Sequence, residues 1–208
     1  KLCYSNPLTL QTYIEAIDRA YTTGKLPRIP DFRLPDDFAI TVSPTDSPID
    51  CHCERCRANW NRGGGSEASY IMADFVARLA REVKKRWPGK KIMYLPYQNY
   101  AQAPEGVEFP DNVEVELCAM PGLALYKEPF IAEREQKDMD DWKRMTGRKI
   151  SMWHYICWPA DQTKATYLFP HVIRDFYQRN RDKVVGSFIN GVPYQNHWRR
   201  QHLSLYIW

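Results

Sequence analysis

The sequence predicts an α/β fold, a (β/α)8 TIM-barrel-like domain of which this chain supplies the later strands. Five short apolar segments have the composition of strands, and each ends in polar or aromatic residues. Helical patterns separate most of these segments, which favours a parallel sheet with right-handed crossovers. Polar side chains at the carboxyl ends of parallel strands are typical of a barrel active site.

The length of the chain qualifies this prediction. A complete barrel typically takes about 250 residues, whereas the chain has 208. We therefore expect a truncated barrel, a single domain over residues 1–208 that is a piece of a longer protein. A complete open doubly wound sheet is the alternative, although no Gly-rich phosphate loop follows any predicted strand.

The elements are predicted in order from local signals. Asn6 and Pro7 begin a first helix that Gly24 ends, and the opening residues 2–3 are a candidate extra strand. A second helix opens at Ser66 and ends before Pro88, and the segment between residues 46 and 65 reads as a long loop. Strands are predicted at residues 38–42, 92–97, 113–119, 150–157 and 184–190, and further helices at residues 131–145, 166–179 (with the helix proper from residue 170) and from 194 onward.

Composition and charge limit the partners. The net charge of +4 is too small an excess to indicate nucleic acid, and no apolar run approaches the roughly 18 residues of a membrane span. Aromatic residues make up 13% of the chain, and many lie near predicted strand ends. Flat apolar rings suit stacking against sugars, but they are equally suited to core packing.

Candidate glycan-binding residues are the aromatic and polar side chains at these strand ends. A histidine there binds sugar hydroxyls or transfers a proton, and a hydrogen-bonded core histidine is the competing interpretation for His154. The candidates are Tyr97, Asn99, Trp153, His154, Tyr155, Asn190, Tyr194 and Trp198.

Three carboxylates are candidates for catalysis. Asp46 follows the first full strand, and Glu114 and Glu116 share one face of the strand at residues 113–119. The other face carries Val113, Val115 and Leu117 and is expected to lie under helices, so both glutamates should face the barrel interior. Partial desolvation of Glu116 would raise its pKa and suit a general acid. The alternatives are ion pairs with inward Lys or Arg for the glutamates and an Asx turn for Asp46.

The segment Cys51-His52-Cys53-Glu54-Arg55-Cys56 is the densest cysteine cluster. Cys51, Cys53 and Cys56 with the imidazole of His52 have the ligand types of a structural zinc site, and Cys3 in place of His52 would make it all-thiolate. Disulfides in an exported protein and reduced, packed thiols are the two other interpretations. All three make the cluster structural, and no required cofactor is expected.

Five short motifs in this order resemble the bacterial family called domain of unknown function 4838, over nearly the whole chain. Part of that family is classed as glycoside hydrolase family 163, endo-β-N-acetylglucosaminidases that act on N-glycans. The motifs are Leu2-Cys3-Tyr4-Ser5-Asn6-Pro7, Val42-Ser43-Pro44-Thr45-Asp46, Cys51-x-Cys53-x-x-Cys56, Asp111-Asn112-Val113 and Trp153-His154-Tyr155.

The resemblance implies an exported bacterial enzyme, in the periplasm, at the cell surface or secreted. It also implies a substrate-assisted retaining mechanism on a glycan or glycoprotein, in which one carboxylate orients the 2-acetamido group and another protonates the leaving sugar. The predicted strand-end geometry, rather than the resemblance, assigns the acid to Glu116 and the polarising role to Asp46 or Glu114. Members often carry an acid after the final strand, where this chain has Asn190, so a catalytic role for that acid would make this copy inactive. A non-catalytic carbohydrate-binding barrel and a glycosidase on uronic-acid glycans are the alternatives.

Overall fold

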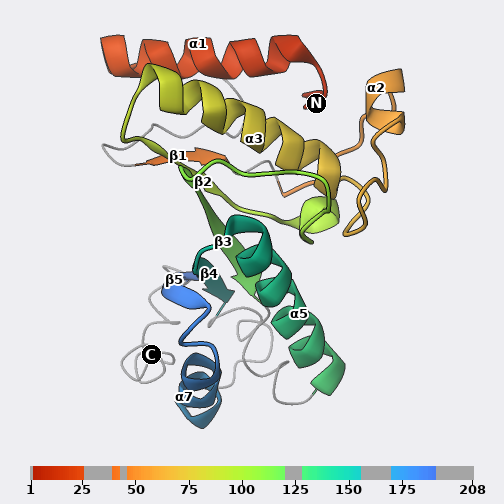
Figure 1. Cartoon of the computed structure of the whole chain (residues 1–208), viewed down its shortest axis with the longest axis vertical. Coiled ribbons are helices and arrows are strands. Elements are labelled where there is room, and N and C mark those ends of the chain that lie inside the picture. The colour runs from red at the N-terminus through yellow and green to blue at the C-terminus, as the bar shows by residue number, and fades with distance from the viewer. Residues whose placement is uncertain (1, 26–38, 43–45, 120–127, 156–169, 191–208) are drawn as a thin grey trace, which may run out of the picture. The chain divides into compact units, whose positions relative to one another are not determined.

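A computed structural model describes residues 2–25, 39–42, 46–119, 128–155 and 170–190, and the fold over these residues is α/β (Figure 1). The helices are α1 (Pro7–Thr23), α2 (Glu54–Arg57), α3 (Ser69–Arg86), α5 (Pro129–Thr146) and α7 (Pro170–Arg179), with a 3-10 turn η1 (Gln98–Tyr100). The strands are β1 (Ala39–Val42), β2 (Lys91–Tyr94), β3 (Val113–Ala119), β4 (Ile150–Tyr155) and β5 (Val184–Asn190).

The described strands lie in one sheet in the order in which they occur in the chain, β1-β2-β3-β4-β5. β2 pairs in parallel with β1 and β3, and β4 pairs in parallel with β5. By contacts, the chain divides into two compact units, Lys1–Glu116 with Arg144–Gly147, and Leu117–Lys143 with Arg148–Trp208. The α/β class and the parallel sheet are therefore confirmed, whereas the truncated barrel and the single domain remain predictions.

The first helix forms where its capping residues predict it. The Asn6 Oδ1 accepts a hydrogen bond from the Leu8 N–H at 3.0 Å, and Pro7 takes the first helical position. Gly24 ends the helix at φ 65°, and its N–H donates to the Ala20 carbonyl at 2.9 Å. Each end of α1 is thus fixed by a residue that the sequence identifies.

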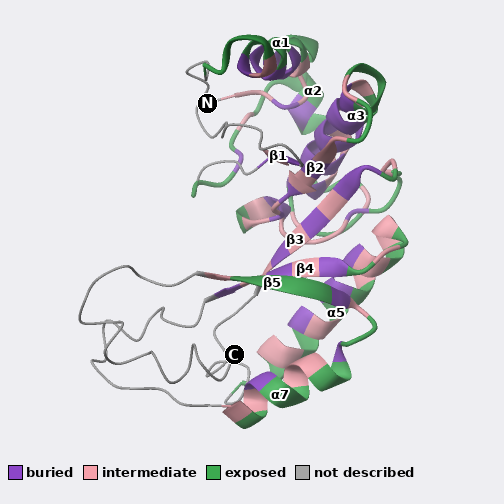
Figure 2. Cartoon of the chain, turned by 90° about the vertical axis from the view of Figure 1, so that its left-hand side faces the viewer, coloured by how far each residue is buried: buried purple, intermediate pink, exposed green. Residues whose placement is uncertain are grey.

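In the first unit, α1 lies along α3, which also contacts β2 (Figure 1). The ring of Phe75 on α3 makes edge-to-face contacts with Tyr4 and Tyr13, at 5.0 and 5.1 Å between centroids. One face of β1, β2 and β3 is buried as far as Leu117, and residues 113–118 of β3 alternate between buried and intermediate (Figure 2). The buried residues of this face are Ile40, Val42, Ile92, Tyr94, Val113, Val115 and Leu117.

Three predicted elements differ from the observed ones. Residues 2–3 are not a strand, and the predicted loop contains α2, a single helical turn. β2 ends at Tyr94 rather than at residue 97, because Pro96 has no N–H with which to continue a ladder. The helix predicted from residue 194 and the strand residues 156–157 lie outside the described residues.

The loop before α3 contains a testable pair of glycines. Gly63 has φ +71°, and a Cβ there would lie 2.3 Å from the Glu105 carbonyl oxygen, whereas Gly64 has φ +69° and open space around its Cα. We expect Gly64→Ala to lower the free energy of unfolding by about 1–2 kcal/mol through backbone strain. Gly63→Ala adds overpacking against the Glu105 carbonyl, so it should lower the free energy of unfolding by about 2–5 kcal/mol. Chemical denaturation of both variants and wild type measures the two losses. Equal losses for the two variants would contradict this close approach.

Candidate functional site

The two glutamates of β3 lie on the face opposite the buried apolar face, as the alternation predicts. Their neighbours Val113, Val115 and Leu117 are buried, whereas Glu114 and Glu116 are of intermediate exposure. Glu114 forms an ion pair with Lys91 of the adjacent strand, and both side chains are about one-third exposed. This contact is the ion pair that the sequence offers as an alternative to catalysis.

Glu116 lies two residues further along β3 and is partly buried. Desolvation by burial raises the pKa of its carboxyl above the ordinary value, and no cation is among the causes of the shift. A carboxyl group that keeps its proton at higher pH is suited to donate it to a leaving group. The geometry therefore distinguishes the two glutamates, because Glu114 has a cation beside it and Glu116 is desolvated.

Asp46 follows β1 after a short segment outside the described residues, and it is exposed. The register places Val42, Tyr94 and Val115 in one row across β1, β2 and β3. Glu116 lies one residue past this row, midway along β3, and Asp46 comes four residues after Val42 in the sequence. β1 and β3 are two positions apart in the sheet. Neighbouring strands are spaced by about 4.8 Å, so the two strands are about 10 Å apart.

Tyr97 and Asn99 follow β2 in the 3-10 turn region, and Asn99 has extensive backbone contacts. Its Nδ2 donates to the Ile49 carbonyl and its Oδ1 accepts from the Ile49 N–H, each at 2.9 Å. The Asn99 carbonyl also accepts from the N–H of Ala68 just before α3, at 2.7 Å. Asn99 thus fixes the loop after Asp46, and its role as a sugar ligand remains a prediction.

The consecutive residues Trp153 and His154 of β4 lie on opposite faces of their sheet. Trp153 pairs in register with Phe188 of β5, with ring centroids 4.3 Å apart. His154 is 3% exposed, and its ring makes edge contacts with Phe176 and Tyr177 of α7. Because side chains alternate along a strand, the two residues cannot both line one pocket. This placement favours the core interpretation of His154.

Burial lowers the pKa of His154 to about 4 from its ordinary value of 6.5. Unfolded protein then binds more protons than folded protein between pH 6.5 and 4, so stability is lost as pH falls through this window. We expect a loss of about 3 kcal/mol in the free energy of unfolding from this residue alone. The difference between wild type and His154→Gln, measured by denaturation from pH 7 to pH 4, should show it. A pH-independent difference would contradict it.

The remaining candidates are located only in part. Tyr155 and Asn190 pair in register at the ends of β4 and β5. Tyr194 and Trp198 lie outside the described residues. A cavity of about 250 Å³ lies between α5 and α7, and Met139, His171 and Phe176 are among its lining residues. It contains none of the predicted site residues.

The cysteine cluster is completed by a residue distant in sequence. The sulfur atoms of Cys3, Cys51, Cys53 and Cys56 all lie within 4.8 Å of one another. Burial and hydrogen bonds with the other thiols raise the pKa of Cys3 to about 12, whereas a backbone hydrogen bond lowers that of Cys53 to about 7. Among the described cysteines none forms a disulfide.

Sequence reasoning missed Lys91, the partner of Glu114. Lys91 opens β2, and only the strand register brings it to the same face as Glu114. The alternation of side chains along β4 is, in contrast, readable from the sequence, and it alone assigns Trp153 and His154 to opposite faces of the sheet.

A protein-family model matches this chain. The model of the family described as "Domain of unknown function (DUF4838)" matches residues 1–208. The chain belongs to this family. No curated protein matches.

The fold is also similar to a solved structure, a mutant of the O-GlcNAc hydrolase of Thermobaculum terrenum. The TM-score is 0.51 at 15% sequence identity, and the match covers 93% of this chain and 38% of that chain. At this identity the likeness concerns the fold alone. In the described part of this DUF4838 chain, no helix combines the length and hydropathy of a bilayer-crossing segment.

Proposed function

We propose that this chain is part of the catalytic domain of a glycoside hydrolase that acts on N-acetylglucosamine-containing glycans. The observation that carries the proposal is the desolvated carboxyl of Glu116, which lies midway along β3, one residue past the partner of the last residue of β2, on the face opposite the buried core. The DUF4838 family and the fold likeness to an O-GlcNAc hydrolase support it. The proposal includes a truncated (β/α)8 barrel and export from a bacterial cell.

In the proposed reaction, the 2-acetamido oxygen of the sugar attacks the anomeric carbon while the bond to the leaving oxygen breaks. Glu116 gives its proton to that oxygen, and its carboxylate then takes a proton from the water that opens the cyclic intermediate. Asp46 orients the acetamide, since the ion pair with Lys91 occupies Glu114. Two displacements at one carbon leave the configuration of the anomeric centre retained.

Product analysis tests this function directly. Incubation of the protein with an N-glycan or a β-linked N-acetylglucosamine oligosaccharide should release a reducing sugar whose first-formed anomer is β, as followed by proton NMR. Release of the α anomer would contradict the substrate-assisted mechanism. Cleavage of glucuronyl oligosaccharides alone would instead identify a glycosidase on uronic-acid glycans.

Glycan binding without release is the outcome expected of a non-catalytic barrel. Measuring glycan affinity by calorimetry on the same preparation separates that outcome from an unfolded sample. Asn190 occupies the place after the last strand where family members often carry an acid, so an Asn190→Asp variant should be assayed beside wild type. Activity gained only in Asn190→Asp would mean that this copy is a degenerate enzyme.

A further inference from the structure

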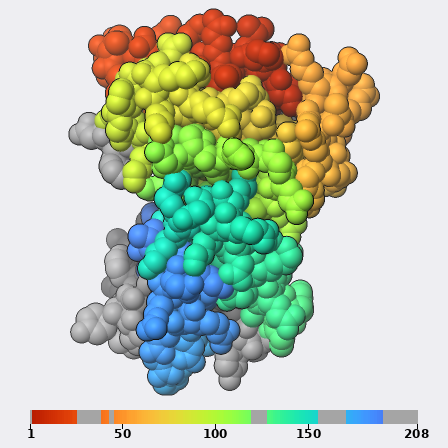
Figure 3. Space-filling view, viewed as in Figure 1, coloured from red at the N-terminus to blue at the C-terminus, as the bar shows by residue number. Residues whose placement is uncertain are grey.

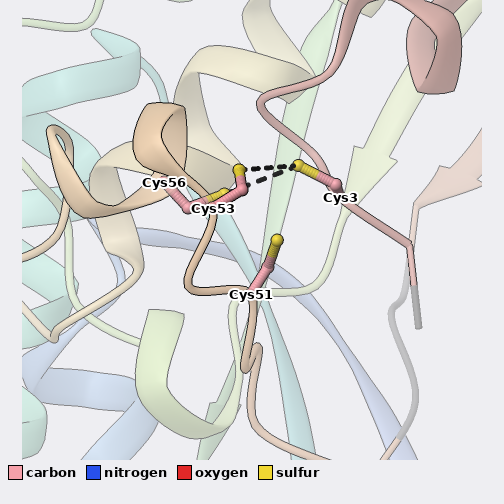
Figure 4. Close-up of side chains that lie close together, drawn as sticks. All are labelled: Cys3, Cys51, Cys53 and Cys56. Carbon is pink, nitrogen blue, oxygen red and sulfur yellow. Dashed lines mark hydrogen bonds between the residues drawn. The ribbon is translucent and has the colours of Figure 1, made fainter.

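The cysteine cluster joins two segments that are far apart in sequence. Cys3 precedes α1, and the other three cysteines lie in and before α2, about 50 residues later (Figure 4). The space-filling view shows the segment that contains them, in orange, beside the red N-terminal residues (Figure 3). In the close-up, the sulfur of Cys51 points toward the space that the other three sulfurs surround.

The sulfur separations match a tetrahedral metal site. The Sγ of Cys3 lies 3.6 Å from the Sγ of Cys53 and 3.6 Å from that of Cys56. Four thiolates placed about 2.3 Å from a central zinc ion lie about 3.8 Å apart. A disulfide requires about 2.05 Å between the two sulfur atoms, so these separations are too long for bonded pairs and fit four ligands around one centre.

His52, the other possible fourth ligand, lies away from the cluster. Its Nε2 is 2.7 Å from an Asp50 oxygen, its side chain is 66% exposed, and its ring lies beside that of Trp60. Cys3, in contrast, is held in place by its own backbone. Its carbonyl accepts hydrogen bonds from the Asn6 N–H at 3.0 Å and the Thr9 hydroxyl at 2.7 Å.

Two further features suit a bound cation. Ser5 Oγ lies 3.3 Å from the Sγ of Cys56 and is placed to donate a hydrogen bond to a thiolate, the kind of contact that orients a metal ligand. Four thiolates and one Zn²⁺ carry a net charge of −2. α2 contains Glu54, Arg55 and Arg57 beside Cys56, so this helix has a net charge of +1, the sign that favours an anionic centre.

We propose that Cys3, Cys51, Cys53 and Cys56 form a closed, all-thiolate zinc site that fixes the segment before α1 to the loop that follows Asp46. Four protein ligands leave no coordination position for substrate, so the ion is structural. Binding energy at such a site is folding energy, because the unfolded chain does not hold the four sulfurs together. The inference does not depend on the proposed glycosidase activity.

Metal analysis of the purified protein, prepared with a non-thiol reductant, tests the site. We expect one zinc per chain in wild type. After the zinc is exchanged for cobalt(II), we expect the visible absorption bands of tetrahedral cobalt(II) together with thiolate-to-cobalt charge-transfer bands. His52→Ala and Cys118→Ser are the matched controls and should keep one metal ion. Cys3→Ser should lose most of it under dialysis against a chelator, and Cys3→His should restore binding with a shifted cobalt spectrum.

The cobalt spectrum of wild type does not depend on whether any variant folds. In a second preparation made without reductant, absence of metal together with absence of free thiols would overturn the proposal in favour of disulfides. Absence of metal with all thiols reactive would overturn it in favour of packed cysteines. Loss of metal in His52→Ala with retention in Cys3→Ser would replace the all-thiolate set by three thiolates and an imidazole.

Discussion

Replacing Glu116 with glutamine is expected to lower kcat on an unactivated glycan by about 10²- to 10⁴-fold, the usual contribution of a general acid. Glutamine preserves the size of the side chain but has no proton that it can give to the leaving oxygen. Steady-state assays on a β-linked N-acetylglucosamine glycan measure this effect. KM should change far less than kcat, because the proton transfer takes place in the transition state.

The leaving group separates proton donation from other roles of Glu116. An aryl glycoside with an acidic phenol departs without protonation, so Glu116→Gln should lose much less activity on it than on the glycan. A loss of equal size on both substrates would assign Glu116 to substrate positioning or folding. Glu114→Gln, two residues away on the same face, should lower kcat less than Glu116→Gln does, because the Glu114 carboxylate already pairs with Lys91.

The pH profile gives a second readout of the same residue. Desolvation raises the pKa of Glu116, so the proton needed for catalysis is lost as pH rises through that raised value, and activity should fall there. On the aryl glycoside this alkaline fall should be weaker. A profile unchanged between wild type and Glu116→Gln would argue against the assignment.

The same pKa shift also predicts the stability of the Glu116→Gln variant. A folded-state pKa above the unfolded value means that the folded protein binds the proton more tightly, so ionised Glu116 disfavours folding above that pKa. Glutamine removes this cost, and the free energy of unfolding of Glu116→Gln at neutral pH should therefore not fall below that of wild type. A loss of activity without a loss of stability is the combination that a catalytic role predicts.

Much of the fold follows from local chemistry that the sequence displays. The caps Asn6 and Gly24 set the ends of α1, and the alternation in β3 by itself assigns Glu114 and Glu116 to one face of the strand. These signals are local, because a cap or a period-2 pattern depends on residues a few positions apart. The family motifs work in the same way, as ordered short segments that the family match over residues 1–208 confirms.

The features that the sequence left open depend on contacts between distant residues. The Lys91–Glu114 ion pair requires the register of β2 against β3, which no local pattern specifies. The choice of Cys3 over His52 for the cysteine cluster requires the chain before α1 to return beside α2. Asn99 is a third example, since its hydrogen bonds to Ile49 span 50 residues.

Phe75→Ala is expected to lower the free energy of unfolding of the chain by about 3–5 kcal/mol, the usual cost of emptying a buried aromatic site. Phe75 is fully buried, and its edge contacts with Tyr4 and Tyr13 join α3 both to α1 and to the segment before it. Denaturation followed by circular dichroism measures the loss. Phe130→Ala is the matched control, because Phe130 is 64% exposed and should change stability by about 0.5 kcal/mol or less.

The position of Tyr4 extends this prediction to the proposed zinc site. Tyr4 directly follows Cys3, so the ring of Phe75 packs against the segment that carries one of the four thiolates. Loss of the ring should loosen that segment and speed the release of zinc to a chelator at a temperature where the variant remains folded. If the rate of zinc release is unchanged, hydrogen bonds to the Cys3 carbonyl hold the thiolate without help from the aromatic contact. If Phe75→Ala loses as little stability as Phe130→Ala, the packing of α1 on α3 is contradicted.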